Sequence, residues 1–373
     1  MTEKTIKTLI FDTDTTGHHI EYLHHLYLGA AQHPENTYVF AVGDDIFDKS
    51  KEFSWKPAAN IEFIHLKEIV GEGAAIVNAY RRFKQLKSVV KQVRPDKVFL
   101  VSLMNFMPFL RFLSRKTKVS GIIYSIYLYD WKSFSATAKI INCLKYRLLK
   151  SRRFERLFVL NDSAATNVMN RVWKTDKYRF LTDPYIPCKV DRDYDLRKEL
   201  GIANDKTMVL HLGALTERKG SLDVVKMIEN TPVCDRDRYC VVFAGRLNDD
   251  IKEEFMQRLE NIGDSMQVIT RFGFLSYDFM GKLVSVADKV VLPYHIVNAS
   301  SGIIGYCAQF EIPVFVPAKG LIFKLVRRHR IGYGLEDFNT LNDLQGDFDK
   351  RCNYCEKHTV GFFINDIFGG QES

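Results

Sequence analysis

Two adjacent serines and a glycine, Ser300, Ser301 and Gly302, stand where a polar loop meets an apolar run. They lie in the stretch 287–320, whose residue order predicts a strand, a loop, a helix and a second short strand. Serine is a good helix cap, and a following glycine lets a ligand approach the unpaired N–H groups at the positive end of the helix dipole. The segment predicts a phosphate site, although a capped helix in an open α/β sheet fits the same residues.

A second candidate loop follows the first apolar strand of the chain. It runs from Thr15 to His18 and contains Gly17. Ligands collect at the carboxyl ends of strands in doubly wound sheets, so this loop is well placed for binding. A glycine turn flanked by two surface histidines is the alternative reading.

Aromatic and acidic residues follow another predicted strand, 121–127. The strand runs directly into Tyr129, Asp130 and Trp131. Rings can stack on a sugar and a carboxylate can accept hydrogen bonds from hydroxyl groups, so this strand end suits a polyol. A buried aromatic cluster around one satisfied aspartate explains the same residues.

The elements that must position these loops are apolar strands alternating with amphipathic helices. This rhythm runs through the chain twice and predicts an α/β protein of two doubly wound parallel-sheet domains. A length of 373 residues suits two domains. We expect an N-terminal domain over 1–184, a linker at about 185–206, and a C-terminal domain over 207–373 whose last helix is a candidate for crossing back. The cleft between the domains is the expected ligand site.

Composition excludes several classes of protein. Hydrophobic residues make up 46% and charged residues 26%, as in ordinary globular proteins. The N-terminal apolar run is too short for a signal peptide, and no window reaches the ~18 apolar residues of a membrane helix, which predicts a cytoplasmic protein. Seven scattered cysteines fit a reducing compartment. The single CxxC pair, Cys352 and Cys355, lacks the second ligand pair of a structural zinc site, so we expect no metal there.

Positive charge is concentrated in one segment. The formal net charge is +8, and residues 80–156 hold 19 Lys or Arg against three acidic residues. Such a segment suits a nucleic acid, an anionic membrane surface or an acidic substrate, and also a set of well-solvated helix faces. No helix-turn-helix, zinc-finger or RNA-binding pattern accompanies it, so we expect no nucleic acid. Solvated helix faces are the commoner explanation of such a charge run, and peripheral attachment to the inner face of a membrane is the functional alternative.

From about 208 to 335 the sequence resembles glycosyltransferase family 4, retaining enzymes with the GT-B fold of two Rossmann-like domains. The motifs that carry the resemblance, in the family's order and spacing, are LHLGALTERKG, VVFAG, RFGFLSYDFMGKLVSVADKVVLPY and SSGIIGYCAQFEIPVFVP. The first half matches weakly, mainly through its glycine loop. The resemblance implies a UDP- or GDP-sugar donor bound mostly by the C-terminal domain, an acceptor bound mostly by the N-terminal domain, and no metal or other cofactor.

The resemblance also implies roles for single residues. Lys219 matches the family's diphosphate lysine, with Arg218 beside it, because cations must offset the charge on the leaving group. In the first domain, Gly17 would lie near the donor phosphates and Asp130 near an active-site residue. Implied donor contacts at the strand ends of the second domain are Gly213, Gly245, Phe272, Gly273, Phe274, Ser300, Ser301 and Gly302.

Two carboxylates of the family pattern are replaced in this sequence. The glutamates that contact the donor sugar and the ribose would fall at Asn298 and Tyr306. An amide and a phenol can still hydrogen-bond to hydroxyl groups, which favours an altered donor pocket. We therefore expect a hexosyltransferase of surface polysaccharide or glycolipid assembly with a glycan or lipid-linked acceptor. A non-catalytic GT-B nucleotide-binding or scaffold protein and a nucleotide-sugar epimerase are the alternatives.

Overall fold

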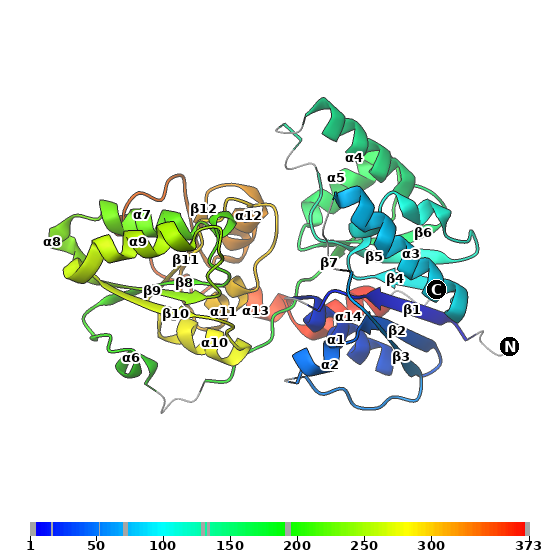
Figure 1. The fold of residues 1–373 in the computed structure, drawn as a ribbon, viewed down its shortest axis with the longest axis horizontal. Coiled ribbons are helices and arrows are strands. Elements are labelled where there is room, and N and C mark those ends of the chain that lie inside the picture. Colours follow the sequence, from blue (N-terminus) through cyan, green and yellow to red (C-terminus); the bar gives the residue numbers. More distant parts are fainter. Residues whose placement is uncertain are drawn as a thin grey trace. The chain divides into compact units, whose positions relative to one another are not determined.

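The chain forms two compact units. The computed structural model describes residues 5–15, 18–51, 53–69, 74–127, 131–132, 135–190 and 195–369. Unit 1 comprises Met1–Thr182 and Val360–Ser373, and unit 2 comprises Asp183–Thr359. Each is a parallel sheet with helices on both faces (Figure 1). The range expected as a linker lies in unit 2, where α6 (Leu196–Glu199) packs against α10 (Tyr277–Val286).

The sheet of unit 1 has seven parallel strands among the described residues, in the order β3-β2-β1-β4-β5-β6-β7. The order reverses direction between β1 and β4, which is the doubly wound arrangement. The strands are β1 (Lys7–Asp12), β2 (Thr37–Gly43), β3 (Ile61–Leu66), β4 (Lys97–Leu100), β5 (Lys118–Ile123), β6 (Phe154–Leu160) and β7 (Tyr178–Leu181).

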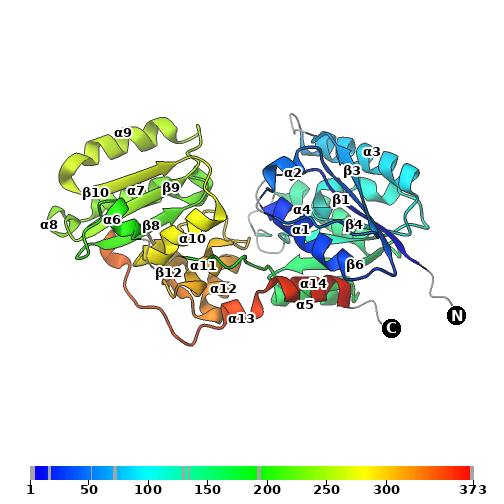
Figure 2. The same ribbon diagram turned by 90° about the horizontal axis from the view of Figure 1, so that it is seen from below.

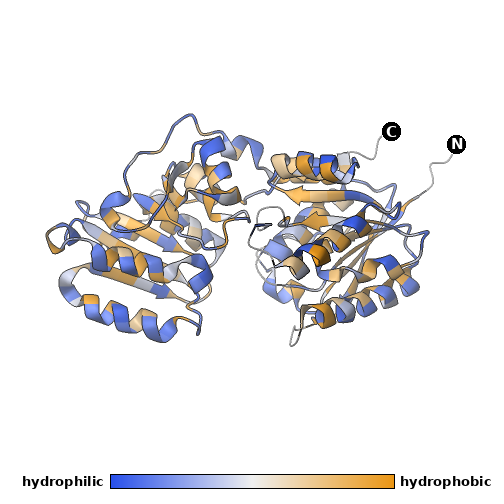
Figure 3. Cartoon of the chain, turned by 90° about the horizontal axis from the view of Figure 1, so that it is seen from above, coloured by the Kyte–Doolittle hydropathy of each residue, from blue (hydrophilic) through white to orange (hydrophobic). Residues whose placement is uncertain are grey.

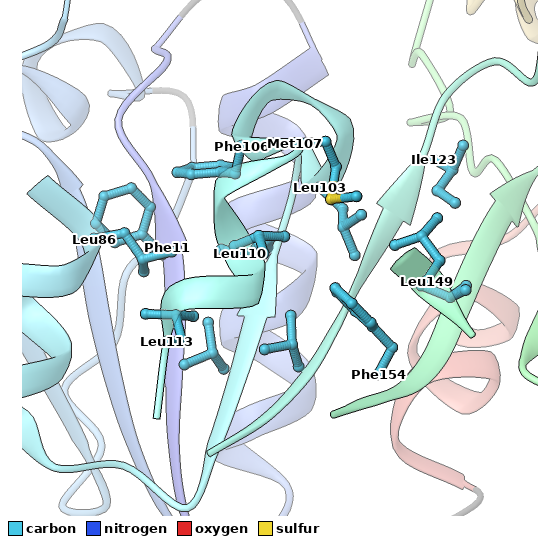
Figure 4. Packing of buried hydrophobic residues seen from close by; sticks show 14 of the residues in the cluster. Phe11, Leu86, Leu103, Phe106, Met107, Leu110, Leu113, Ile123, Leu149 and Phe154 are labelled. Atoms are coloured by element: carbon cyan, nitrogen blue, oxygen red, sulfur yellow. The ribbon is translucent and has the colours of Figure 1, made fainter. Parts of the chain in front are cut away.

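Two helical layers cover this sheet because successive strand residues point to opposite faces. Leu9 and Phe11 of β1 pack in one core cluster, and Ile10 packs in the other. Figure 4 shows Phe11 among residues of the first cluster. That face carries α3 (Ala75–Val93), the short 3-10 helices η1 (Leu103–Phe106) and η2 (Phe109–Phe112), α4 (Ala136–Leu149) and α5 (Ser163–Trp173), and the opposite face carries α1 (His18–Ala31), α2 (Ile46–Lys49) and α14 (Val360–Phe368).

The last helix, α14, returns to unit 1 after the whole of unit 2. Phe363 stacks on Tyr22 of α1 with ring centroids 5.4 Å apart. The backbone N–H of Thr182 donates to Asp366 Oδ2 at 2.9 Å. Arg156 donates from Nη1 to the carbonyl oxygen of Ile367 at 2.8 Å. Unit 1 is therefore completed by the two ends of the described chain.

The sheet of unit 2 has six parallel strands in the order β10-β9-β8-β11-β12-β13, with its reversal between β8 and β11. One face packs on α7 (Ser221–Asn230) and α9 (Lys252–Ile262), and α10, α11 (Ile303–Gln309) and α12 (Gly320–His329) lie on the other (Figure 2). The strands are β8 (Thr207–Leu212), β9 (Tyr239–Gly245), β10 (Gln267–Phe272), β11 (Lys289–Val291), β12 (Val314–Pro317) and β13 (Gly332–Leu335), and shorter helices are α8 (Val233–Arg236) and α13 (Tyr354–Lys357).

Hydropathy follows this layering in both units. Apolar residues occupy the strands and the inner sides of the helices, and polar residues occupy the outer sides (Figure 3). None of the described helices has both the length and the hydropathy needed to cross a bilayer. All seven cysteines, including Cys352 and Cys355, are free thiols.

Candidate functional site

Three glycines end three neighbouring strands of unit 2. Gly213, Gly245 and Gly273 follow or close β8, β9 and β10 with φ of +115°, +140° and +128°, a region that favours glycine. The Gly213 N–H donates to the Ala244 carbonyl at 2.9 Å, and the Gly273 N–H donates to the Gly245 carbonyl at 3.1 Å. A Cβ on Gly245 would lie 1.8 Å from the Gly213 oxygen. The carboxyl ends of these three strands therefore carry no side chain at the positions where the resemblance puts the sugar donor.

The loop after β8 is held by its own hydrogen bonds. Thr216 accepts at Oγ1 from the Lys219 N–H, and its own N–H donates to Ser221 Oγ, both at 3.1 Å. Gly220 has φ +70°, and a Cβ there would meet the Pro293 carbonyl oxygen at 2.1 Å. The loop is therefore packed directly against the segment that follows β11, at the point where the strand order of unit 2 reverses. Open α/β sheets bind ligands at this position.

A buried histidine supports the loop from below. His211 of β8 is 1% exposed; its Nδ1 lies 3.0 Å from the Val291 carbonyl oxygen, and its Nε2 lies 3.0 Å from Ser221 Oγ. A carbonyl can only accept, so Nδ1 carries the proton and Nε2 accepts from the Ser221 hydroxyl. Burial lowers the pKa of His211 to about 4, so the ring is neutral at neutral pH. The sequence analysis missed this histidine; its only signal is one polar residue in an apolar strand beside a glycine.

Lys219 extends from this loop over an aromatic ring. Its Nζ lies 3.7 Å from the centroid of Tyr294, and the Tyr294 hydroxyl lies 3.2 Å from Ser301 Oγ. Among the described residues Lys219 has no carboxylate within ion-pair distance. The neighbouring Arg218 is exposed, and its carbonyl accepts from the His295 N–H at 3.0 Å. The ammonium group is thus positioned by a ring and remains available to an anion.

The start of α11 differs from the expectation. The helix begins at Ile303, its N-cap is Gly302, and no side chain caps it, so the prediction that the serines cap this helix is wrong. Ser301 is 4% exposed, and its hydroxyl is paired with Tyr294 instead. Ser300 is partly buried. A contact of these residues with phosphate stays a prediction.

The other predicted donor residues fall into an exposed and a buried group. Phe272 is 43% exposed and Phe274 is 93% exposed, on either side of Gly273. Asn298 and Tyr306 are 9% and 5% exposed, inside unit 2. The aromatic pair is open to a ligand, whereas the two residues at the family's glutamate positions are largely enclosed by the protein.

A carboxylate–histidine pair lies at the corresponding strand end of unit 1, where burial raises the pKa of Asp12. Asp12 closes β1, and its Oδ2 lies 2.6 Å from Nδ1 of His19, whose Nε2 is 3.5 Å from Asp14 Oδ2. The His19 ring lies against Tyr124 with centroids 5.7 Å apart. Burial lowers the pKa of His19, but the hydrogen bond and charge of Asp12 outweigh it, so the pKa lies above its ordinary value. No sequence motif indicated this pair, and the histidines beside Gly17 entered only the alternative reading of that loop, as surface residues.

Gly17 and Asp130, the predicted site residues of the first domain, lie outside the described residues. Tyr127, which precedes the second of them, is 8% exposed, and its ring packs against Tyr146 at 4.5 Å.

Comparison with known proteins gives matches to solved structures. No family model and no curated protein matches the sequence. Anabaena Alr3699/HepE in complex with UDP-glucose is similar with a TM-score of 0.68 at 14% identity, over 98% of each chain. WaaG, a glycosyltransferase involved in lipopolysaccharide biosynthesis, is similar with a TM-score of 0.65 at 13% identity, over 98% of this chain and 96% of that one. A putative UDP-N-acetylglucosamine 2-epimerase from Listeria monocytogenes is similar with a TM-score of 0.61 at 15% identity, over 97% and 94%. This chain therefore has the GT-B fold, built from two Rossmann-like domains.

Proposed function

We propose that this protein is a glycosyltransferase that moves a hexose from a UDP- or GDP-sugar to a glycan or lipid-linked acceptor, with retention of configuration and without a metal. One observation carries the proposal: Lys219, on the loop after β8 at the switch point of unit 2, lies over the Tyr294 ring without a described carboxylate partner, and β8 and the next two strands end at bare glycines. A nucleotide diphosphate needs both close approach to backbone and a positive charge. Similarity to solved structures, HepE in complex with UDP-glucose among them, supports this choice of ligand.

In the proposed reaction, the bond between the sugar and the diphosphate breaks while the acceptor hydroxyl attacks the anomeric carbon. Negative charge grows on the departing diphosphate, and the Lys219 ammonium offsets it. Arg218, exposed on the same turn, assists. The bare edge at Gly213, Gly245 and Gly273 accommodates the nucleotide, and the family pattern places the base near Phe272 and Phe274.

Unit 1 is proposed to receive the acceptor. Its basic segment, 80–156, would attach the protein to an anionic membrane surface, since each Lys or Arg near such a surface contributes about 1 kcal/mol. Arg153 takes no part, because its guanidinium donates to the Leu110 carbonyl within unit 1. Co-sedimentation with neutral and anionic vesicles at several salt concentrations tests the attachment. Equal recovery on both kinds of vesicle would remove it.

Thermal stabilisation by a panel of UDP, GDP and their sugars, followed by donor hydrolysis and transfer assays, tests the main proposal. We expect one nucleotide class to raise the melting temperature and its sugar to be slowly hydrolysed, also after treatment with EDTA. Nuclear magnetic resonance of the first-formed product reports retention or inversion. Binding with no turnover under any condition would favour the non-catalytic scaffold.

An epimerase is the second candidate function. The similarity to the putative epimerase from Listeria monocytogenes favours it, at a TM-score below those of HepE with UDP-glucose and WaaG. Interconversion of the sugar on the nucleotide without any acceptor would establish this alternative in place of transfer.

A further inference from the structure

A groove of about 1760 Å³ opens on the surface of unit 1. Its walls are the first turns of α3, the segment of η1 and η2, the outer side of α4, and the end of α5. The whole groove therefore belongs to one unit and lies on the helical face that covers the larger core cluster of that unit.

The charges around the groove have one sign. Among the described residues its lining contains no aspartate or glutamate, and it contains six cations, which come from all the elements that form the walls. These cations are Arg82, Arg111, Lys145, Arg147, Lys150 and Lys174. A groove with this lining attracts an anion from every side.

The surface between these cations is apolar. Met107 is 2% exposed, and Leu148 and Trp173 are partly buried against the core. Toward the opening, Ile141 is 47% and Leu144 is 56% exposed. Tyr146 and Leu149 of α4 are buried, whereas Ile140, Ile141 and Leu144 of the same helix are exposed. Covering an aliphatic side chain of this size completely contributes about 1.5–3 kcal/mol.

We propose that this groove binds a single anionic membrane lipid, with its acyl chain along the apolar floor and its phosphate against the basic rim. The combination of cations and apolar surface in one groove fits an anionic amphiphile in both parts of its structure. A second copy of this chain is a poor occupant, because it would bring the same six positive charges to the interface. The proposal concerns the lipid part of the lipid-linked acceptor proposed above. It rests on that proposed function only for the biological role of the bound lipid.

A bound acyl chain should make lipid binding at this groove less sensitive to salt than binding at a surface that is only basic. Attraction between exposed charges is screened when the Debye length falls to about 3 Å in about 1 M salt. Contact between an acyl chain and apolar side chains persists and is strengthened by salting-out anions. Salt should therefore weaken lipid binding at the groove without abolishing it.

Trp173 provides a direct readout, because it lines the groove. Lysophosphatidylglycerol with a brominated chain, kept below its micelle concentration, should quench its fluorescence. Lysophosphatidylcholine with the same chain should bind about tenfold more weakly, and Trp173→Phe should remove the quenching while calorimetry still detects binding. These measurements use a protein with Trp55→Phe and Trp131→Phe, in which Trp173 is the only tryptophan. Calorimetric binding without quenching of Trp173 would place the lipid elsewhere.

Two matched variants of α4 decide the role of the groove. Ile141→Ser with Leu144→Ser should weaken lysophosphatidylglycerol binding about tenfold, since two partly exposed apolar contacts are lost. Ile140→Ser changes a side chain that is 61% exposed on the same helix but does not line the groove, and should bind as the unchanged protein does. Circular dichroism confirms that all variants fold. Equal affinity of all three, or complete loss of binding in about 1 M salt, would overturn the proposal.

Nucleotide binding on the same preparations separates this inference from the proposed function. Lipid binding without any nucleotide binding would contradict glycosyl transfer and keep the groove assignment. Nucleotide binding without quenching by the lipid would contradict the groove assignment and leave glycosyl transfer in place.

Discussion

The two units use the loop after their first central strand in opposite ways. In unit 1, β1 ends at Asp12, whose carboxylate is paired with His19 at 2.6 Å. In unit 2, β8 ends before Gly213, and the buried His211 below it makes only neutral hydrogen bonds. The free cation of this second loop, Lys219, lies over a ring. One topological position thus holds a carboxylate–histidine pair in one unit and, among the described residues, a lysine without a carboxylate partner in the other.

The difference follows from which polar group is buried. A buried charge needs a partner, and the Asp12–His19 contact supplies it within unit 1. Unit 2 buries a neutral histidine, and the positive charge of its loop is carried by Lys219 at the surface of the loop. Of the described residues of these two loops, a lysine without a carboxylate partner is found in the second. The proposed division between acceptor unit and donor unit rests on this contrast.

Removing the Lys219 ammonium is expected to have the largest effect of the tests that follow. Lys219→Ala should leave the fold intact and lower turnover by roughly two to three orders of magnitude, since a lost preorganised group costs about 2.7–4 kcal/mol in the barrier. Steady-state kinetics with the stabilising donor measures it, with Lys226→Ala, on the adjacent helix α7, as the control. Unchanged turnover in Lys219→Ala would remove the donor assignment from unit 2.

Acid should loosen unit 2 through His211. Its pKa is about 4 in the folded protein against an ordinary 6.5, so the unfolded chain binds a proton that the folded chain does not. Stability is present above pH 6.5 and is lost as the pH falls toward 4, by about 3 kcal/mol. Hydrogen exchange of β8 and β9 against pH measures this loss. His211→Gln should reduce the slope without removing it, because burial lowers the pKa of His358 in the same unit to about 4 as well. An unchanged slope would exclude His211 as a cause.

Changing the ring under Lys219 should have a smaller effect on affinity. Tyr294→Leu removes a cation–π contact worth about 1 kcal/mol that the ammonium gives up when it moves to the phosphate, so nucleoside diphosphate should bind about fivefold more tightly. Tyr294→Phe keeps the ring and loses only the contact with Ser301, so its affinity should stay within about twofold. Calorimetric titration compares them. If both variants bind alike, the ring does not position the ammonium.

The smallest expected effect is the opposite pH dependence of unit 1. The pKa of His19 is raised in the folded protein, so its stabilising contribution is present below pH 6.5 and is lost as the pH rises through the folded pKa. Burial works against this shift, which keeps the effect below that of His211. Hydrogen exchange of β1 and β2 should speed up over that range, and His19→Asn should abolish the change. Exchange that instead speeds up toward acid would contradict the ion pair.

The fold could be predicted from the sequence because strands and helices produce local patterns of apolar and polar residues. Apolar runs predicted the central strands of both sheets, and the order of motifs predicted the GT-B fold. The glycines at the strand ends were also recognisable in the sequence. The structure gives the reason at Gly245, where a side chain would collide with the neighbouring loop. Local patterns were insufficient where side chains meet across distant loops. The contact of Lys219 with Tyr294 is of this kind.

The same limit explains the error at α11 and the missed histidines. Ser301 has the right residue type for a cap, but the Tyr294 hydroxyl, seven residues earlier, takes its oxygen. His211 and His19 acquire their roles from Ser221 and Asp12, and neither pairing follows a sequence motif. Residue type was therefore predictable, whereas the partner of each polar group required the structure.

A crystal soaked with the nucleotide that stabilises the protein tests the central claim most directly. The account predicts density for the diphosphate within hydrogen-bond distance of Lys219 Nζ, at the edge formed by Gly213 and Gly245. It also predicts that the ammonium moves from the Tyr294 ring toward the phosphate. A nucleotide bound away from this edge, or a diphosphate that leaves Lys219 on the ring, would contradict it.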